Sequence, residues 1–246
     1  MAADLTENNR KHFDKVASNH QSDFGTLIQQ AIKELQARRL WISPKWTDTA
    51  PDAEIRLLDY ACGAGTVSKA LAPYTTQTAG LDLSANMITE YNNAVEELGL
   101  DSSRMQGYQY DLLADTNTNS TLPDGALAGK FDVIAIGMAL HHVSDPAALL
   151  RRFASLLKPG GVCVVLERVP GRDTEPGLEE VLEAEQLSVM KTIAKHGFTE
   201  EEMRGLYEQA GMGKGFEYVV IEEPFRFTMF GNQFGTTGFL TRGEVV

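Results

Sequence analysis

Apolar and polar residues follow one another along the chain in two different patterns. Over residues 1–46 the apolar positions recur at helical spacing among charged residues, which predicts one or two amphipathic helices. From residue 55 onward, short apolar runs alternate with helical segments. This alternation is typical of βαβ units and predicts a parallel sheet covered by helices on both faces.

The expected elements of this sheet follow in a regular order. Strands are predicted over residues 55–61, 78–83, 106–113, 131–140 and 161–167, and helices over 68–74, 84–100 and 146–157. The polar residues 114–130 predict a surface loop. Beyond the alternating part we predict helices over 177–197 and 198–211, the second capped by Thr199 with Glu202 three residues on, and two closing strands over 216–223 and 236–243.

The composition limits the partners and the compartment. The chain has 246 residues and a formal net charge of -12, so a nucleic acid would approach against the mean field and is not an expected partner. Its two cysteines, Cys62 and Cys163, form neither a disulfide framework nor a zinc spacing. No run approaches the ~20 apolar residues of a membrane span. We therefore expect a soluble, cytoplasmic protein that binds no metal.

Residues 57–71, LLDYACGAGTVSKAL, lead from an apolar strand through a turn of small residues into a helix. Gly63 and Gly65 let the backbone turn sharply and approach a ligand at the carboxyl end of the strand. A dinucleotide fingerprint would need a glycine or alanine where this chain has Ser68. Asp59 would repel a pyrophosphate but attract an ammonium or sulfonium group. Asp82, in the place where a ribose diol is usually bound, completes a pattern that predicts a nucleoside with a positively charged tail.

Five segments together resemble the successive motifs of class I S-adenosylmethionine-dependent methyltransferases. They are LLDYACGAGTVS, AGLDLSANMI, YQYDLL, FDVIAIGMALHHV and LLKPGGVCVVLE. The subgroup that they resemble contains small-molecule C-methyltransferases of ubiquinone and menaquinone biosynthesis, and FDKVASNHQSD and FTEEEMRGLYEQAGM are similar to its first and late helical segments. Ala61 replaces a common glycine, which is tolerated if this residue keeps an ordinary φ, and His20 replaces a usual tyrosine.

The resemblance implies a three-layer, Rossmann-like α/β fold. Its sheet would have seven strands, mostly parallel, with an antiparallel last strand. A helical lid over residues 1–50 would cover a methyltransferase domain over 51–246, which would carry a helical insertion around 170–198. S-adenosylmethionine is the implied cofactor and a small-molecule methyl acceptor the implied partner, while the oligomeric state stays open.

By the same resemblance, the cofactor contacts fall on residues of these motifs. The expected set is Asp59, Ala61, Cys62, Gly63, Gly65, Asp82, Leu83, Met87, Asp111, Leu112, Gly137 and Met138. Within this set, Asp59 and the turn would lie near the methionine portion, and Asp82 near the ribose. Residues 83, 87, 111 and 112 would surround the adenine, and residues 137 and 138 would line the floor near the sulfonium. Phe13 and His20 are expected on the substrate side.

Several of these residues have a plain structural alternative. Asp82 could cap the helix that begins near Ser84. Asp111 could be a turn residue only. Cys62 is expected to be a small buried residue, because no basic residue that would activate its thiol stands near it in the sequence.

His141 and His142 are the candidate proton acceptors. A base is needed only if the acceptor arrives protonated, since the displacement itself depends mainly on alignment. Because adjacent residues rarely face the same way, at most one of the two is expected to reach the pocket. We favour His142, which lies further along the loop, and expect it to have a pKa near neutrality. His20 is a second candidate.

Three other functions remain open at this stage. An NAD-dependent oxidoreductase would share the sheet, although Ser68 and Asp59 argue against it. The protein could bind S-adenosylmethionine without transferring its methyl group, either as a regulator or to stabilise negative charge in a different reaction. Apolar residues within 168–198 and 222–240 suggest an uncharged or aromatic acceptor, or simply pack the last strands.

Overall fold

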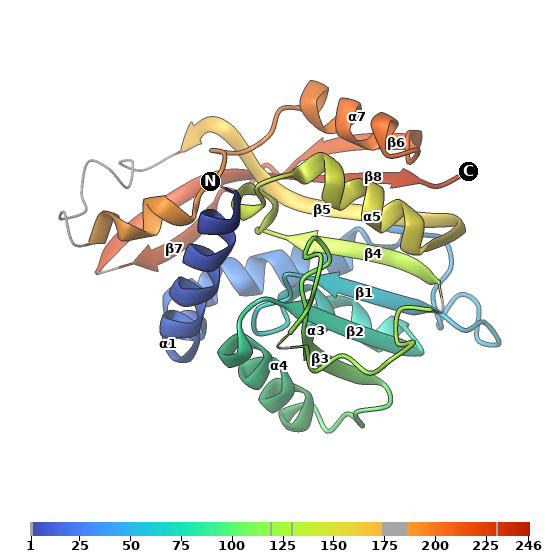
Figure 1. Ribbon diagram of the computed structural model, residues 1–246. Helices are drawn as coiled ribbons and strands as arrows, with labels where there is room; N and C mark the ends of the chain where they lie inside the picture. The colour runs from blue at the N-terminus through green and yellow to red at the C-terminus, as the bar shows by residue number, and fades with distance from the viewer. Residues whose placement is uncertain (1, 119, 129, 174–185, 230) are drawn as a thin grey trace.

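The computed structural model describes residues 2–118, 120–128, 130–173, 186–229 and 231–246. A mixed sheet of eight strands forms its centre (Figure 1). The strands are β1 (Arg56–Tyr60), β2 (Gln77–Asp82), β3 (Met105–Gln109), β4 (Phe131–Gly137), β5 (Leu157–Asp173), β6 (Lys214–Val220), β7 (Phe225–Met229) and β8 (Asn232–Glu244). They lie in the order β3-β2-β1-β4-β5-β8-β6, and β7 pairs with the first part of β8.

The strand directions match the predicted topology. β1 to β5 are parallel to one another, whereas β8 runs antiparallel to β5, β6 and β7. The seven-stranded path is therefore present, with the last strand of the chain antiparallel, and β7 adds an eighth strand. The order reverses between β1 and β4, which is the place where open α/β sheets bind their ligands.

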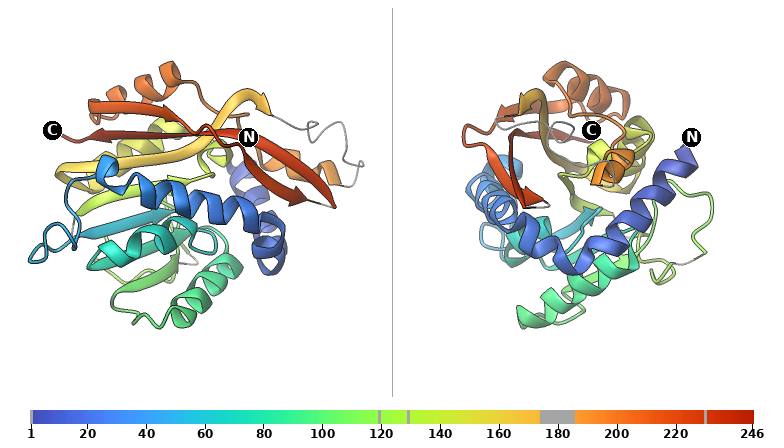
Figure 2. Two further views of the ribbon diagram at one scale, coloured as in Figure 1. Left: turned by 180° about the vertical axis from the view of Figure 1, so that it is seen from behind. Right: turned by 90° about the vertical axis from the view of Figure 1, so that its left-hand side faces the viewer.

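Helices cover both faces of the sheet. The helices α1 (Ala2–Ala37), α2 (Arg39–Ile42), α3 (Thr66–Leu71) and α4 (Ala85–Glu97) lie on one face, and α5 (Pro146–Leu156) and α7 (Glu200–Gln209) lie on the other (Figure 2). Leu57 packs with the first group and Leu58 with the second, because successive side chains of a strand point to opposite faces. Three short 3-10 helices, η1 (Ala72–Tyr74), η2 (Leu140–His142) and η3 (Gln186–Thr192), connect other elements.

The first helix reaches past the sheet. Its two halves run in different directions in the right-hand view of Figure 2, and the first half crosses the edge where the parallel strands end. One long helix thus takes the place of the one or two that the apolar spacing predicts. The predicted N-cap of α7 is confirmed, because Thr199 and Glu202 form a reciprocal capping box.

Two predicted elements differ from the structure. The strand expected over 106–113 ends at Gln109, and the chain then turns. Of the helix expected over 177–197, residues 174–185 lie outside the described residues, and the described part holds η3, a 3-10 helix that ends at Thr192. Strand β7 was not predicted. None of the helices in the described parts of the chain is both long enough and apolar enough to cross a membrane.

Candidate functional site

A cavity of about 280 Å³ lies at the carboxyl ends of the parallel strands, under α1. Helix α1 contributes one stripe of side chains at helical spacing, among them Asn9, Phe13, His20 and Phe24. The opposite wall is made by the loops that follow β1, β2, β3 and β4, and by the end of β5. Residues on or directly after five parallel strands, together with residues from the first helix and the last strands, therefore meet at one site.

The turn after β1 has a left-handed backbone at three of its residues. Ala61, Gly63 and Gly65 have φ values of 53°, 50° and 87°. The condition under which Ala61 would replace the glycine without strain, an ordinary φ, is not met: this alanine adopts the conformation for which glycine is suited, at a cost of ~1–2 kcal/mol. Gly65 forms the N-cap of α3 and does not line the cavity, so its role is to make the turn.

Asp59 sits at the base of this turn and is almost fully buried. Its Oδ2 accepts hydrogen bonds from the backbone N–H of Ser68 at 2.9 Å and from the Ser68 hydroxyl at 2.7 Å. Burial raises the pKa of this carboxyl to about 7, against the lowering effect of the two Ser68 bonds. A cationic ligand in the cavity would therefore favour ionisation of Asp59 at neutral pH.

Asp82 ends β2 and links two loops. Its Oδ2 accepts from the Gly63 N–H and its Oδ1 from the Ser84 N–H, both at 2.9 Å. Burial raises the pKa of Asp82, although these backbone bonds act in the opposite direction. The N-cap of α4 is Ser84, whose hydroxyl accepts from the Met87 N–H, so the alternative of Asp82 as the capping residue is wrong.

The loop after β3 places Asp111 at the cavity but turns the next residue away. The Asp111 Oδ1 accepts from the Leu113 N–H at 2.8 Å, which makes it a turn residue as well as a lining residue. The Leu112 side chain is buried in the core, and Leu113 lines the cavity in its place. The expected adenine contact by Leu112 is thus not supported by its side chain.

The other expected cofactor residues line the cavity. Leu83 and Met87 do so from the start of α4, Cys62 from the turn, and Gly137 and Met138 from the end of β4. Burial raises the pKa of the Cys62 thiol well above its usual value, in agreement with its expected role as a small buried residue. Met138 has a φ of 53° and donates its N–H to the Leu166 carbonyl, which fixes the chain where β4 ends.

Both histidines of the pair line the cavity, which overturns the expectation that at most one would reach it. They lie in η2, where the tight 3-10 turn keeps their rings 4.0 Å apart between centroids. The Nδ1 of His141 lies 2.9 Å from both carboxylate oxygens of Glu167, and the His141 backbone N–H donates to the same carboxylate.

Glu167 is fully buried and holds His141 in place. Burial alone would raise the pKa of Glu167, but His141 and the backbone N–H groups of residues 141 and 168 hold it below its usual value. The carboxylate is therefore ionised and accepts the proton of Nδ1, which leaves Nε2 of His141 as the proton-accepting nitrogen.

His142 has a different environment. Its Nδ1 donates to the Thr192 carbonyl at 2.7 Å, and its ring makes an edge contact with Phe13 at 5.1 Å between centroids. Burial and the neighbouring His141 lower the pKa of His142 well below its usual value. The expectation of a pKa near neutrality is wrong, and this imidazole is a weak base at pH 7.

Four buried polar atoms of the cavity lining have no hydrogen-bond partner among the described residues. They are Asn9 Oδ1, His20 Nδ1, Arg168 Nε and Thr236 Oγ1. Burying such atoms unpaired is unfavourable by ~1–3 kcal/mol each, so a ligand that satisfied them would gain this free energy. Phe13 and His20 thus lie where a substrate role was expected, on the α1 side of the cavity.

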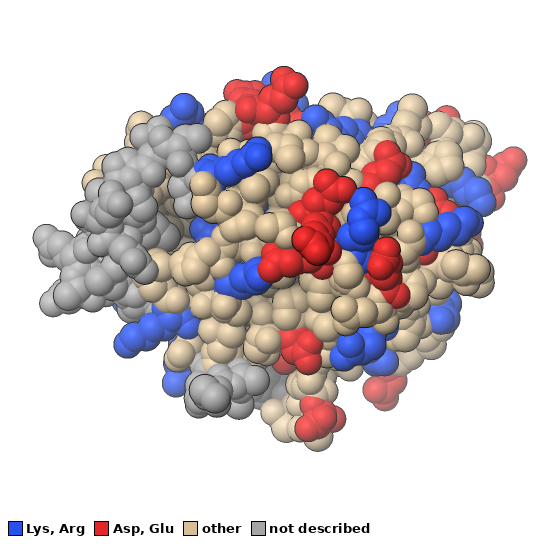
Figure 3. Space-filling model, turned by 90° about the horizontal axis from the view of Figure 1, so that it is seen from above, with Lys and Arg blue, Asp and Glu red and all other residues tan. Residues whose placement is uncertain are grey.

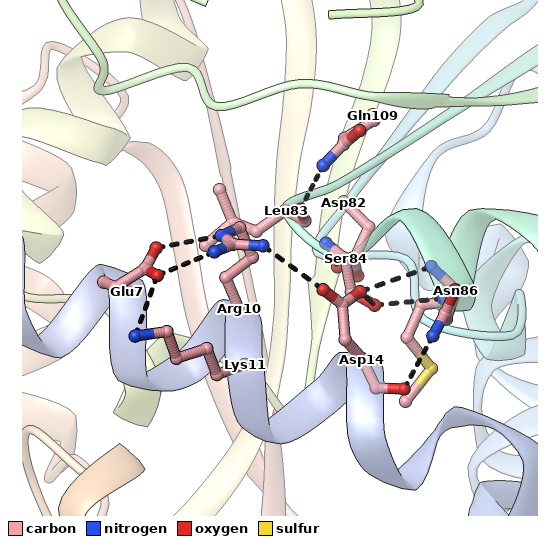
Figure 4. A network of polar contacts seen from close by, with 10 residues as sticks. Glu7, Arg10, Lys11, Asp14, Asp82, Leu83, Ser84, Asn86 and Gln109 are labelled. Carbon is pink, nitrogen blue, oxygen red and sulfur yellow. Dashed lines mark hydrogen bonds and ion pairs between the residues drawn. The ribbon is translucent and has the colours of Figure 1, made fainter. Parts of the chain in front are cut away.

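A polar network ties α1 to the loop that follows β2 (Figure 4). The Asp14 carboxylate accepts from the Ser84 hydroxyl at 2.6 Å, and the Asp14 carbonyl accepts from the Asn86 side chain at 2.9 Å. Arg10 connects the same carboxylate to Glu7 on the helix. Because Ser84 also bonds to Asp82, the cover and the expected ribose site share one set of hydrogen bonds.

Sequence reasoning missed Glu167, Thr192, Arg168, Thr236 and the Asp14 contact. A signal for Glu167 was present, because this acid follows an apolar run of the sequence as Asp59 does. The partners of the other residues come from segments far apart in the chain, and no spacing in the sequence indicates them.

Comparison with known proteins finds relatives that are named as methyltransferases. A protein-family model described as a methyltransferase domain matches residues 27–213. An uncharacterized methyltransferase from Schizosaccharomyces pombe is 30% identical over 156 residues, covering 63% of this chain and 52% of that protein. A ubiquinone biosynthesis O-methyltransferase from Psychrobacter arcticus is 35% identical over 111 residues, covering 45% of this chain and 39% of that protein. The chain thus spans about half or less of the length of these relatives.

Solved structures share the fold at low sequence identity. Magnesium protoporphyrin IX methyltransferase from Synechocystis, with bound S-adenosylmethionine, has a TM-score of 0.58 at 15% identity, and the match covers 99% of this chain and 98% of that one. Phosphoethanolamine N-methyltransferase 2 from Haemonchus contortus also has a TM-score of 0.58 at 15% identity, with 87% and 52% covered. At these identities the likeness establishes the fold alone.

Proposed function

Because this chain belongs to the methyltransferase-domain family, we propose that it transfers a methyl group from S-adenosylmethionine to a small-molecule acceptor. The family and the α/β fold predicted from the sequence are confirmed. The main support for the proposal is that the two ends of the cavity differ. Carboxylates lie beside the turns after β1 and β2, and a histidine pair lies after β4. We further propose that the protein acts in the cytoplasm and that residues 1–50 act as its lid.

The residues present fit the proposed cofactor. The described cavity lining includes four aspartates, at positions 23, 59, 82 and 111, and one arginine, so its charge suits a ligand with ammonium and sulfonium groups. We assign Asp82 to the ribose hydroxyls, Asp59 and the 61–63 backbone to the methionine portion, and Leu83, Met87 and Asp111 to the adenine. When bound, S-adenosylmethionine would supply an electrophilic methyl group that requires no metal.

His141 is the better candidate for the proton acceptor. Its Nδ1 is fixed by an ionised, buried Glu167, as in other sites where a carboxylate orients a catalytic imidazole. His142 is assigned to packing against Phe13 and holding η3 through Thr192. A base is useful only for an acceptor that loses a proton, so we propose methylation of a hydroxyl group. The name of the Psychrobacter arcticus relative supports transfer to oxygen.

Calorimetry tests the cofactor assignment. Replacing Asp82 by alanine removes a charge-assisted contact and should weaken binding of S-adenosylhomocysteine by ~2–3 kcal/mol. Asp101→Ala is the matched control, because this exposed aspartate also bonds to a backbone N–H two residues on. Equal affinity in the wild type and Asp82→Ala would contradict the ribose assignment, and no binding in the wild type would contradict the proposed function.

Turnover tests the base. With 3,4-dihydroxybenzoate as the acceptor probe, His141→Ala should reduce formation of S-adenosylhomocysteine by ~10²–10⁴-fold at unchanged cofactor affinity. Glu167→Gln should give a smaller loss. His142→Ala should stay within about tenfold of the wild type, because burial lowers the pKa of its imidazole and makes it a weak base. A larger loss in His142→Ala than in His141→Ala, with both proteins folded, would reverse the assignment. Binding of cofactor without any transfer would favour the non-methylating alternative.

A further inference from the structure

Arg168 is the one Lys or Arg side chain in the described lining of the cavity. It stands on β5 two residues after Leu166, which also lines the cavity, so both side chains leave the strand on the α1 side. No carboxylate of the described residues pairs with its guanidinium. Its Nη2 lies 3.3 Å from Nδ1 of the exposed His196. Within the described parts of the chain, the positive charge of Arg168 therefore has no counter-ion.

The Nε–H of Arg168 is buried and has no acceptor among the residues that the structure describes. Leaving such a donor unpaired is costly, and the cost is higher for a charged group. Thr236, on β8, also lines the cavity and is 3% exposed, and its buried hydroxyl oxygen has no partner in the described parts of the chain. The pairing of Arg168 with Gly238 places Thr236, two residues along β8, on the same face of the sheet as Arg168. Two unsatisfied hydrogen-bonding groups therefore face one part of the cavity.

This part of the cavity is the acceptor side. Asp82 lies on β2, and β1 and β4 separate β2 from β5 in the sheet. Arg168 follows directly after Glu167, which holds His141, and its backbone N–H donates to the same carboxylate. The charge of Arg168 also acts on His142. A group bound to Arg168 would thus belong to the molecule that lies against the histidine pair.

We propose that the methyl acceptor carries a carboxylate, which Arg168 binds through its guanidinium with Thr236 as a second donor. The inference rests on the proposed function and names the class of its substrate. A guanidinium matches a carboxylate in shape and charge, and a charge-assisted bond of this kind restores the partner that Nε lacks. Phe227 and Met229 lie in the same lining and would contact the apolar body of the acceptor. The proposed acceptor is thus an aromatic molecule that also carries a carboxylate.

The test compares two probes of nearly equal shape, benzoate and benzamide. With the protein saturated by S-adenosylhomocysteine, calorimetry should show benzoate binding about tenfold or more tightly than benzamide. Arg168→Gln should reduce this preference to about unity, Arg168→Lys should keep part of it, and Thr236→Val should weaken benzoate only. Arg172→Gln is the matched control, since this exposed arginine lies on the same strand outside the cavity.

Several results would overturn the inference. They are equal binding of the two probes or no binding of either, a benzoate preference that survives in Arg168→Gln, and a loss of cofactor affinity in Arg168→Gln. The last result would assign the arginine to the cofactor carboxylate. Failure of the proposed function is distinguishable, because it would appear as no binding of S-adenosylhomocysteine to the wild type in the first titration.

Discussion

Asp59 couples its own ionisation to the ligand. Its folded pKa of about 7 lies above the ordinary 3.8 because burial disfavours the charge. Near pH 6 most molecules carry a proton on Asp59, which must leave before the carboxylate can attract a cation. Affinity for S-adenosylmethionine should therefore rise about tenfold between pH 6 and pH 8 and then level off.

Calorimetry at several pH values would measure this dependence. Asp59→Asn should bind more weakly and with a flat pH profile, since its amide does not titrate and can still accept one bond from Ser68. A profile in Asp59→Asn as steep as in the wild type would assign the titration to another group, such as Asp82.

Ala61 offers a test of backbone strain. Its φ of 53° is unfavourable for alanine by ~1–2 kcal/mol, whereas glycine adopts it freely but loses more entropy on folding. Ala61→Gly should thus raise the free energy of unfolding by ~0.5–1 kcal/mol, measured by urea denaturation. Ala64→Gly is a control in the same turn, where φ is not positive, and should lower it. A loss of stability in Ala61→Gly would show that the strain is absent.

The sequence identifies a site residue when a functional side chain stands at the end of a predicted strand. Asp59 and Asp82 each end an apolar strand, and parallel strands bring their carboxyl ends to one edge, so their convergence is predictable. Arg168 and Thr236 line the same cavity because β5 and β8 pair in one particular antiparallel register, which no spacing in the sequence reveals. The low pKa of His142 likewise follows from its burial against α1 and η3. The contacts with Phe13 and Thr192 that bury it join segments far apart in the chain, so the sequence does not indicate them.

At the level of elements, β1, β4 and β5 were predictable because each contains a short apolar run, whereas β3 has the sequence MQGYQ and its end was misplaced. Residues 225–229 alternate between apolar and polar side chains, which is a strand signal, but the run has only five residues and directly follows Pro224, and β7 was not predicted. In the structure this strand pairs with β8. The helix expected from residue 177 has an apolar stripe, yet its described end is η3, which packs against α1 through tertiary contacts.

Helix α1 should respond to the ligand as a cover. The Asp14 contacts to Ser84 and Asn86 hold it over the cavity, and a bound ligand would add contacts to its inner stripe. S-adenosylhomocysteine should thus slow thermolysin cleavage within residues 10–30. Asp14→Ala should speed cleavage of the free protein about fivefold, which corresponds to the loss of ~1 kcal/mol of hydrogen bonding.

The exposed Gln21 on the same helix supplies the control variant, Gln21→Ala, which should be cleaved like the wild type. Equal cleavage rates with and without the ligand would mean that α1 does not act as a cover. Equal rates in Asp14→Ala and the wild type would mean that the network of Figure 4 does not hold it closed.

Across the whole molecule, charged side chains are distributed differently on the surface and in the cavity. Acidic and basic side chains are interspersed on the face shown in Figure 3, in a chain of net charge -12. Within the cavity lining, by contrast, Asp59, Asp82 and Asp111 follow β1 to β3 and Arg168 lies on β5, while the fourth aspartate, Asp23, stands on α1. Charge thus orients ligands inside the cavity, with the cationic portion toward one end and an anionic group toward the other.

The cavity also affects how the stability of the whole protein depends on pH. Burial is the main cause that lowers the pKa of His12, His20 and His142, so these histidines are neutral in the folded protein. Asp59 acts in the opposite sense: it keeps its proton in the folded state up to pH of about 7, whereas the unfolded chain loses it near 3.8. Acidification therefore removes stability through the histidines and adds stability through Asp59.

His20 gives the clearest measurement of this balance. Burial, assisted by Lys69 and opposed by Asp23, lowers its pKa to about 4, and its Nδ1 is buried without a partner among the described residues. Since the unfolded pKa is 6.5, its contribution is fully present above pH 6.5 and is lost as the pH falls toward 4. Between pH 7 and pH 5, ligand-free wild type should lose ~1–2 kcal/mol more unfolding free energy than His20→Gln. Urea denaturation at both pH values measures the difference, and Asp59→Asn should shift it the other way. Parallel losses in the wild type and His20→Gln would show that His20 takes up its proton without unfolding.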